Sequence, residues 1–178
     1  MPWSDVVFVL GHVGIGLGIA WLLTYRRPVS IDYRLVLVGT MLPDLIDKPL
    51  GSLLGLQERL WAHSLLFLVV LLALSRIPRI RGLEWVGFGV ATHFLLDLIW
   101  DTPNAFLWPF GGPFLPSTFS VGSYVHILLT DPYVQAGEIV GTVALVAIAW
   151  SCGIRSWAAF RGFLRTGSLA RRPSLASA

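Results

Sequence analysis

Six histidine and aspartate residues stand inside otherwise apolar stretches of this 178-residue chain. Imidazole nitrogens and carboxylate oxygens are the usual protein ligands for zinc and related divalent ions. Six such groups are enough to hold one ion fully, or two ions with open positions, and a cation would offset the cost of burying the carboxylates. The sequence therefore predicts a site for one or two divalent metal ions, with zinc expected, whose ligands are His12, Asp44, Asp47, His63, His93 and Asp97.

The spacing of these residues supports a shared site. His93 and Asp97 are four residues apart, which places them on one face of a helix, and Asp101 is one further step along the same face. Asp44 and Asp47 are three residues apart and share a face if their segment is helical. Each pair can therefore present two ligands in one direction.

The composition indicates a membrane protein. The chain is 55% hydrophobic and only 13% charged, with a mean hydropathy of +0.72, whereas soluble domains carry roughly 25% charged residues. Its length allows about five membrane-spanning helices of about 20 residues each. The single Cys152 excludes an internal disulfide. We expect an all-α fold, with one transmembrane helical domain over residues 1–165 and a disordered basic cytoplasmic tail over residues 166–178.

Apolar stretches provide the elements that must position the site. The first is long enough to cross the roughly 30 Å hydrocarbon core as one helix. A cleaved signal peptide is the rival interpretation, but the stretch has no basic segment before it and no small-residue cleavage site after it. The five predicted transmembrane helices, forming a polytopic bundle, cover residues 6–24, 35–56, 60–75, 83–100 and 134–151.

Two segments depart from simple membrane helices. Pro43 and Pro49 each remove a backbone donor from the second stretch, and irregular backbone at membrane depth is tolerated only where it is buried in protein or lines a cavity. A broken second helix that opens onto a cavity is therefore expected. Residues 101–133 contain no Lys or Arg but many Pro, Gly and aromatic residues, which is typical of an outer loop or re-entrant cap at the membrane interface.

The basic residues predict the orientation. With five spans, the loops on one side and the carboxyl-terminal tail contain eleven Arg residues, whereas the other side contains only Lys48 and Arg59. Cytoplasmic loops hold the excess of positive charge, so the amino terminus is expected outside and the carboxyl terminus in the cytoplasm. Orientation and contact with anionic lipid then explain the net charge of +3. Membrane lipids are the expected partners, nucleic acid is not, and the oligomeric state is left open.

In this arrangement the six candidate ligands lie in one layer near the outer surface. Taken singly, His12 is more simply a hydrogen-bonding contact between helices, and Asp97 could pair with Arg59 or Lys48. The joint pattern favours a metal site, because accidental polar residues would be scattered through the bilayer and would include basic partners within the spans. His126, by contrast, is expected to be a structural or loop residue.

Four short motifs resemble, in order, the inner-membrane metal-dependent hydrolase family of the YdjM type. They are GHVGIG at 11–16, MLPDLIDKP at 41–49, RLWAHSLL at 59–66, and GVATHFLLD at 89–97 followed by LWPF at 107–110. The resemblance implies metal-binding roles for the same six His and Asp residues, and a distant similarity to zinc phospholipases C and single-strand nucleases. It also implies hydrolysis of a phosphoester.

The predicted function is a membrane-embedded, metal-dependent hydrolase that acts on a phosphoester or other polar lipid headgroup at the extracytoplasmic face. Asp47 or Asp101 is expected to act as the general base, and Arg59 to contact an anionic headgroup. The alternative is a transporter or a metal or proton conduit, since intramembrane carboxylates also mark transport sites. A conduit needs polar groups in the inner half of the bundle, where residues 17–23, 66–74 and 86–91 offer essentially none. If the chain is instead a purely structural membrane protein, His93→Ala and Asp97→Ala are expected to leave bound metal unchanged.

Overall fold

The computed structural model describes residues 9–24, 30–117 and 121–169, and this part of the chain contains helices and no extended strand. The prediction of an all-α fold is confirmed. A single isolated bridge joins Leu56 to Pro116. The α-helices are α1 Val9–Thr24, α2 Tyr33–Leu54, α3 Leu65–Leu74, α4 Leu83–Leu96, α5 Pro103–Phe106, α6 Val121–Thr130, α7 Pro132–Ser151 and α8 Trp157–Thr166, and the 3-10 turns are η1 Trp61–His63, η2 Pro78–Ile80 and η3 Ile99–Asp101.

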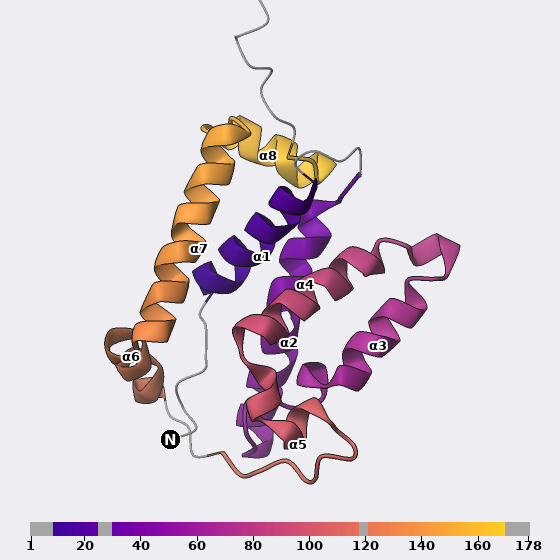
Figure 1. The fold of residues 1–178 in the computed structure, drawn as a ribbon, viewed down its shortest axis with the longest axis vertical. Coiled ribbons are helices and arrows are strands. Elements are labelled where there is room, and N and C mark those ends of the chain that lie inside the picture. The colour runs from indigo at the N-terminus through magenta and orange to yellow at the C-terminus, as the bar shows by residue number, and fades with distance from the viewer. Residues whose placement is uncertain (1–8, 25–29, 118–120, 170–178) are drawn as a thin grey trace, which may run out of the picture.

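Helices α1 and α7 lie side by side and run in the same direction (Figure 1). A side chain at Gly14 would collide with the backbone of Gly141, and one at Gly141 would collide with the backbone of Leu10 and Gly11. Small residues of this kind let two helix backbones approach closely. The Glu138 carboxylate adds a hydrogen bond of 2.7 Å from the Gly11 backbone N–H, so the start of α1 is fixed to α7.

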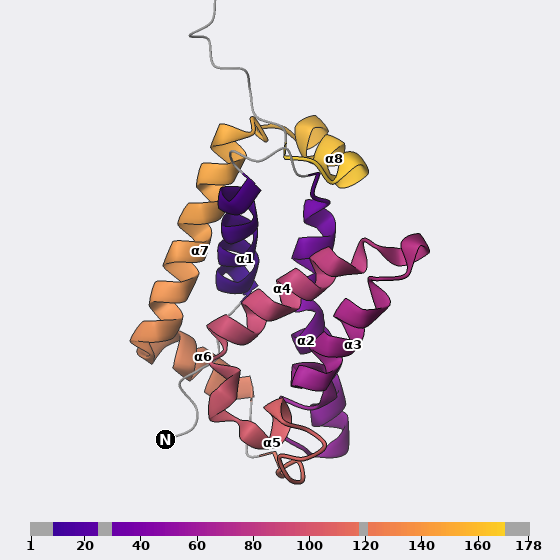
Figure 2. The same cartoon turned by 45° about the vertical axis from the view of Figure 1, so that its right-hand side comes forward.

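Helices α2 and α4 form the second close pair, visible in Figure 2. Gly39 and Gly89 stand at the contact, where an added Cβ at either position would meet the backbone of the other helix. The approach is close enough for the His93 ring on α4 to reach the Thr40 carbonyl on α2, at 2.8 Å. Glycines thus bring the predicted ligands of α2 and α4 together.

The expected break in the second helix is wrong, because α2 continues from Tyr33 to Leu54 through both Pro43 and Pro49. Proline is tolerated inside a buried helix when neighbouring groups hold the chain in place. Here both ends are also fixed. The Asp32 side chain caps the first turn by accepting from the Arg34 backbone N–H, and Gly55 ends the helix in the left-handed conformation.

The predicted spans differ in length from the helices that form. Only α7, at 20 residues, is long and apolar enough among the described helices to cross a membrane, since 20 residues at 1.5 Å each reach about 30 Å. Helix α2 is longer, at 22 residues, but carries Asp44, Asp47 and Lys48 in its second half. The predicted helix 60–75 begins only at Leu65, and the predicted helix 83–100 ends at Leu96. The polytopic five-span arrangement is therefore not established by helix length.

Within the predicted outer segment, residues 101–117 and 121–133 form short helices, a loop and the start of α7. Gln57 holds this loop to the end of α2, since its side-chain oxygen accepts from Asn104 at 2.7 Å and from the Leu115 backbone N–H at 3.1 Å. Asp131 then caps α7 through the backbone N–H groups of Tyr133 and Val134. The loop is thus tied to the same end of the fold as η1.

An additional helix, α8, lies across the opposite end of the bundle, where α1 ends and α2 begins (Figure 1). The Tyr33 backbone N–H donates to the Gly167 carbonyl at 2.9 Å. Hydrogen bonds from Arg34 hold the pKa of the Asp32 carboxyl below its usual value. The first residues of the predicted tail, 166–169, are thus packed against α2, while residues 170–178 lie outside the described residues.

Candidate metal centre

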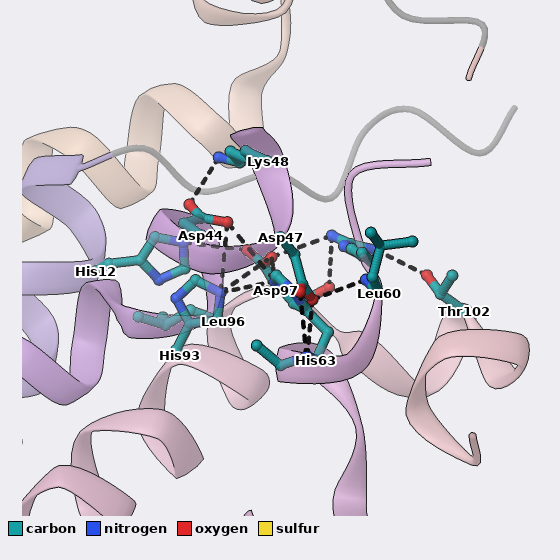
Figure 3. A network of polar contacts seen from close by, with 12 residues as sticks. His12, Asp44, Asp47, Lys48, Leu60, His63, His93, Leu96, Asp97 and Thr102 are labelled. Atoms are coloured by element: carbon teal, nitrogen blue, oxygen red, sulfur yellow. Dashed lines mark hydrogen bonds and ion pairs between the residues drawn. The ribbon is translucent and has the colours of Figure 1, made fainter. Parts of the chain in front are cut away.

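Four buried side chains converge where the second half of α2, the η1 turn and the end of α4 meet (Figure 3). Asp44, His63, His93 and Asp97 each offer one ligand atom, and these atoms all lie within 4.8 Å of one another. The structure therefore brings together four of the six predicted metal ligands from three separate elements.

Hydrogen bonds fix how the two histidine rings present their nitrogens. His63 Nδ1 lies 2.8 Å from an Asp47 carboxylate oxygen, and His93 Nδ1 lies 2.8 Å from the Thr40 carbonyl oxygen. Both partners can only accept, so Nδ1 carries a proton in each ring, and in a neutral ring Nε2 then carries the lone pair. The two Nε2 atoms nevertheless face each other at 3.1 Å.

The carboxylates add further acceptors to this meeting point. Asp44 Oδ1 is buried without a hydrogen-bond partner and lies 3.6 Å from His63 Nε2 and 3.8 Å from His93 Nε2. Asp97 Oδ2 lies 3.6 Å from His93 Nε2 and 3.9 Å from His63 Nε2. Acceptors gathered this closely in a buried space favour a positive charge between them, which can be a divalent metal ion or a proton shared by the two histidine rings.

A divalent metal ion fits this donor set. Two imidazole nitrogens and two carboxylate oxygens are ligands that zinc accepts in a tetrahedral arrangement. Tetrahedral ligands about 2.1 Å from zinc lie about 3.4 Å from one another. Five of the six separations between the ligand atoms here are 3.1 to 3.9 Å, and all four atoms lie within 4.8 Å of one another. The residues therefore fit a single four-coordinate ion with little rearrangement.

Asp47 lies outside this group of four, and its roles as metal ligand and general base stay predictions. Its two oxygens accept from the backbone N–H groups of Leu60, Ala62 and His63 and from the His63 ring. Three of these four donors converge on Oδ2 and one on Oδ1, so both oxygens are engaged by the segment that carries His63. Asp47 instead orients the His63 ring, as carboxylates do for metal-bound histidines.

His12 lies beside the four ligands. Its ring stacks on that of His93 with the centroids 4.0 Å apart, and its Nε2 atom lies 3.1 Å from Asp97 Oδ1. Both ring nitrogens are buried and make no hydrogen bond. The prediction thus placed His12 in the correct layer, but its ring nitrogens lie outside the group whose atoms converge.

Two basic residues flank the carboxylates. Lys48 Nζ donates to Asp44 Oδ2 at 2.6 Å, and Arg59 lies 3.4 Å from Asp97 Oδ2 while donating to the Asp97 carbonyl and to the Thr102 hydroxyl. The alternative pairing of Asp97 with Arg59 is therefore present. It occupies one side of Asp97 and leaves the carboxylate within the group of four.

Asp101 does not share the face of His93 and Asp97, contrary to the sequence prediction. The helix ends at Leu96, and Leu98 then takes the left-handed conformation with φ at 45°, which turns the chain away from the helical path. Asp101 lies in η3 with an exposed side chain. Sequence spacing alone could not reveal this end, because Leu seldom adopts that conformation.

The sequence did not indicate the backbone partners of the site. The Thr40 carbonyl fixes the His93 ring, and the backbone N–H groups of Leu60, Ala62 and His63 fix the Asp47 carboxylate that orients the His63 ring. Every non-proline residue carries such groups. The only available signal was Gly39 and Gly89, whose missing side chains allow α2 and α4 to approach.

Replacing Asp47 tests its positioning role. Asp47→Asn removes the negative charge and places an amide NH₂ group against backbone donors, so the His63 ring loses its orientation. We expect zinc affinity to fall by about 10- to 100-fold, measured by competition with a chromophoric chelator. Asp101→Asn is the matched control and should leave the affinity unchanged. An Asp47→Asn protein with wild-type affinity would contradict the assignment.

Comparison with known proteins places the whole arrangement in a family. No curated protein and no solved structure matches the chain. A family model described as YdjM inner membrane protein matches residues 8–163, a range that includes both close helix pairs and all four converging ligands. The chain therefore belongs to the YdjM family of inner membrane proteins.

Proposed function

We propose that this chain is a membrane-embedded, metal-dependent hydrolase acting on a phosphoester or other polar lipid headgroup. One observation carries the proposal, which is the meeting of His63 Nε2, His93 Nε2 and Asp44 Oδ1, an oxygen without a hydrogen-bond partner, in a buried space. A divalent cation would satisfy all three groups when both rings are neutral. The phosphoester preference rests on the resemblance of the four motifs.

The ligands assigned to the ion are Asp44, His63, His93 and Asp97. When bound, a divalent ion such as zinc would supply a Lewis acid. Four protein ligands close a tetrahedral site, so an activated water would bind only if the ion became five-coordinate or one carboxylate gave up its position. Asp47 orients His63, and Arg59 holds the end of α4 through the Asp97 carbonyl and Thr102. The side chains of Lys48 and Arg59 are 26% and 15% exposed, and we assign them to hold an anionic headgroup.

Helix directions support a five-span arrangement. The end of α1 meets the start of α2, where the Thr24 and Tyr33 hydroxyls are 2.7 Å apart, so these two helices run in opposite directions. Helix α4 runs with α2, helix α7 runs with α1, and α3 connects α2 back to the start of α4. We propose that the five helices cross the membrane alternately, with the amino terminus outside and the metal centre towards the extracytoplasmic face.

The distribution of buried polar groups favours an enzyme over a conduit. Away from the centre, the buried hydroxyl residues of the described helices include Thr40, Ser75 and Thr92. Each of these hydroxyls donates to a carbonyl of its own helix, three residues earlier. Such local bonds do not form a path for ions, so the polar centre is best interpreted as a site open to one side.

Hydrolysis by the zinc-loaded protein tests the proposal. The full chain in detergent is incubated with bis(p-nitrophenyl) phosphate and, separately, with phosphatidylglycerol in mixed micelles, and the released nitrophenol and headgroup are measured. We expect metal-dependent turnover that the double variant His93→Ala, Asp97→Ala abolishes. The matched variant His126→Ala changes an exposed histidine of α6 and should retain full turnover. Zinc-loaded wild-type protein that cleaves neither probe would overturn the proposal.

A further inference from the structure

We propose that α8 is an interfacial helix that lies in the headgroup region of an anionic phospholipid membrane. The arginines of this segment set the expected orientation, but no helix was expected there, and α8 lies at the end of the bundle where α1 ends and α2 begins (Figure 2). The proposal concerns a lipid contact of the protein as a whole and is independent of the hydrolase activity.

The first observation is an apolar stripe on the outer side of α8. Trp157, Phe160 and Leu164 are 65%, 38% and 46% exposed, and their spacing of three and four residues places them on one face. Phe163 points the other way and is buried in the core with Leu17. The helix therefore has one apolar side that packs on the bundle and a second that no described residue covers.

The second observation is the charge beside that stripe. Arg161 and Arg165 are four residues apart on the exposed side of α8, and Arg155 stands just before the helix. No acidic residue occurs in α8. An apolar stripe flanked by arginines is the pattern of helices that lie in the plane of a membrane surface, and arginine attracts anionic headgroups there.

The third observation is continuity with the surface of the membrane helix α7. Its residues Ile139, Val143, Val146 and Trp150 are each more than 60% exposed and follow one another along a single face. That face ends at Trp150, over whose ring the Arg155 guanidinium lies at 3.7 Å. Trp is enriched at the membrane interface, so the apolar surface of α7 leads directly to the start of α8.

The position of α8 is fixed by the start of α2. Arg34 Nη1 donates to the carbonyls of Leu164 and Arg165 at 2.9 and 3.0 Å. Gly167 takes the left-handed conformation beside Asp32, where a side chain would collide with the carboxylate. These contacts hold the apolar stripe in one orientation, so no folding upon binding is required.

Environment-sensitive probes on the full chain test the proposal. Cys152→Ser removes the single cysteine, and a new cysteine at Leu164 or at Ala158 carries an NBD group. Leu164 lies within the apolar stripe, whereas Ala158 is exposed on the side of Arg165. Both proteins are placed in nanodiscs, which expose both membrane faces, made of phosphatidylcholine alone or with phosphatidylglycerol.

We expect the probe at 164 to emit further to the blue and to be quenched by aqueous acrylamide several-fold less than the probe at 158. Lipids with a nitroxide near the headgroup should quench it, and lipids with a nitroxide at the chain end should not. Phosphatidylglycerol should further reduce the acrylamide quenching of the probe at 164. The double variant Arg161→Gln, Arg165→Gln should lose this additional reduction, because each arginine contributes about a fivefold gain in affinity for an anionic surface.

Several results would overturn the proposal. Equal acrylamide quenching at 164 and 158 would place α8 in water. If acrylamide quenching at 164 changes neither with phosphatidylglycerol nor with the Arg161→Gln, Arg165→Gln substitutions, α8 does not contact anionic headgroups. Protection that appears only when each nanodisc holds two copies of the chain would assign the stripe to a protein contact. Unchanged zinc content and melting temperature in the labelled proteins show that each variant is folded.

Discussion

The double variant His93→Ala, Asp97→Ala is expected to lose the zinc that the wild-type chain retains, about one equivalent for a site of four ligands. These residues supply two of the four ligand atoms, and the remaining pair, Asp44 and His63, comes from different elements. Zinc sites of four ligands bind with about 10 to 16 kcal/mol, so losing half of the ligands weakens binding on the order of 10⁴-fold. Metal analysis of the detergent-purified protein measures the loss.

Two further variants sharpen that experiment. His126→Ala changes an exposed histidine and should retain the full metal content. His12→Ala should also retain it, because the His12 nitrogens lie outside the converging group, although the His93 ring loses the stacked neighbour at 4.0 Å. Loss of metal from His12→Ala would instead make His12 a ligand, as the sequence predicts. A well-folded wild-type protein that binds no metal would contradict the site altogether.

The ligand types and their layer could be predicted from the sequence because burying charge is costly. His63 and His93 stand in apolar segments of the sequence, where a polar side chain is costly to bury. A functional role was therefore the natural prediction for both. The division of labour between Asp44 and Asp47 could not be predicted. Both lie on the buried face of α2, and only the position of η1, whose backbone N–H groups saturate Asp47, separates ligand from positioning residue.

The helices were predictable as apolar runs, but their ends were not. A run such as 60–75 contains no mark that distinguishes the η1 turn from α3, because the Ser64 cap is a single polar residue in an apolar segment. In α2 the two prolines predicted a break that the helix does not have, since tertiary contacts override their local preference. Helix α8 was missed because its amphipathic period occurs among arginines and small residues that also suit a disordered tail.

Gly89→Ala is expected to be among the most destabilising small substitutions in the protein. The new methyl group would meet the Val36 carbonyl and the Thr40 amide of α2, which are backbone atoms that cannot rotate away. Overpacking of a buried contact costs about 3 kcal/mol when the backbone must shift. The shift would also separate the His93 ring from the Thr40 carbonyl, so the variant should lose zinc affinity together with stability.

The same substitution at Gly162 in α8 supplies the matched control, because an added Cβ there meets nothing within 4 Å. Alanine is favoured over glycine inside a helix by about 0.8 to 1 kcal/mol, so Gly162→Ala should leave stability unchanged or raise it. For a chain of this size, about 3 kcal/mol corresponds to a melting temperature lowered by about 10 °C, and thermal unfolding of the two proteins in one detergent measures the difference. Equal melting temperatures would mean that α2 and α4 can separate freely, and the geometry that orients His93 would then lack its support.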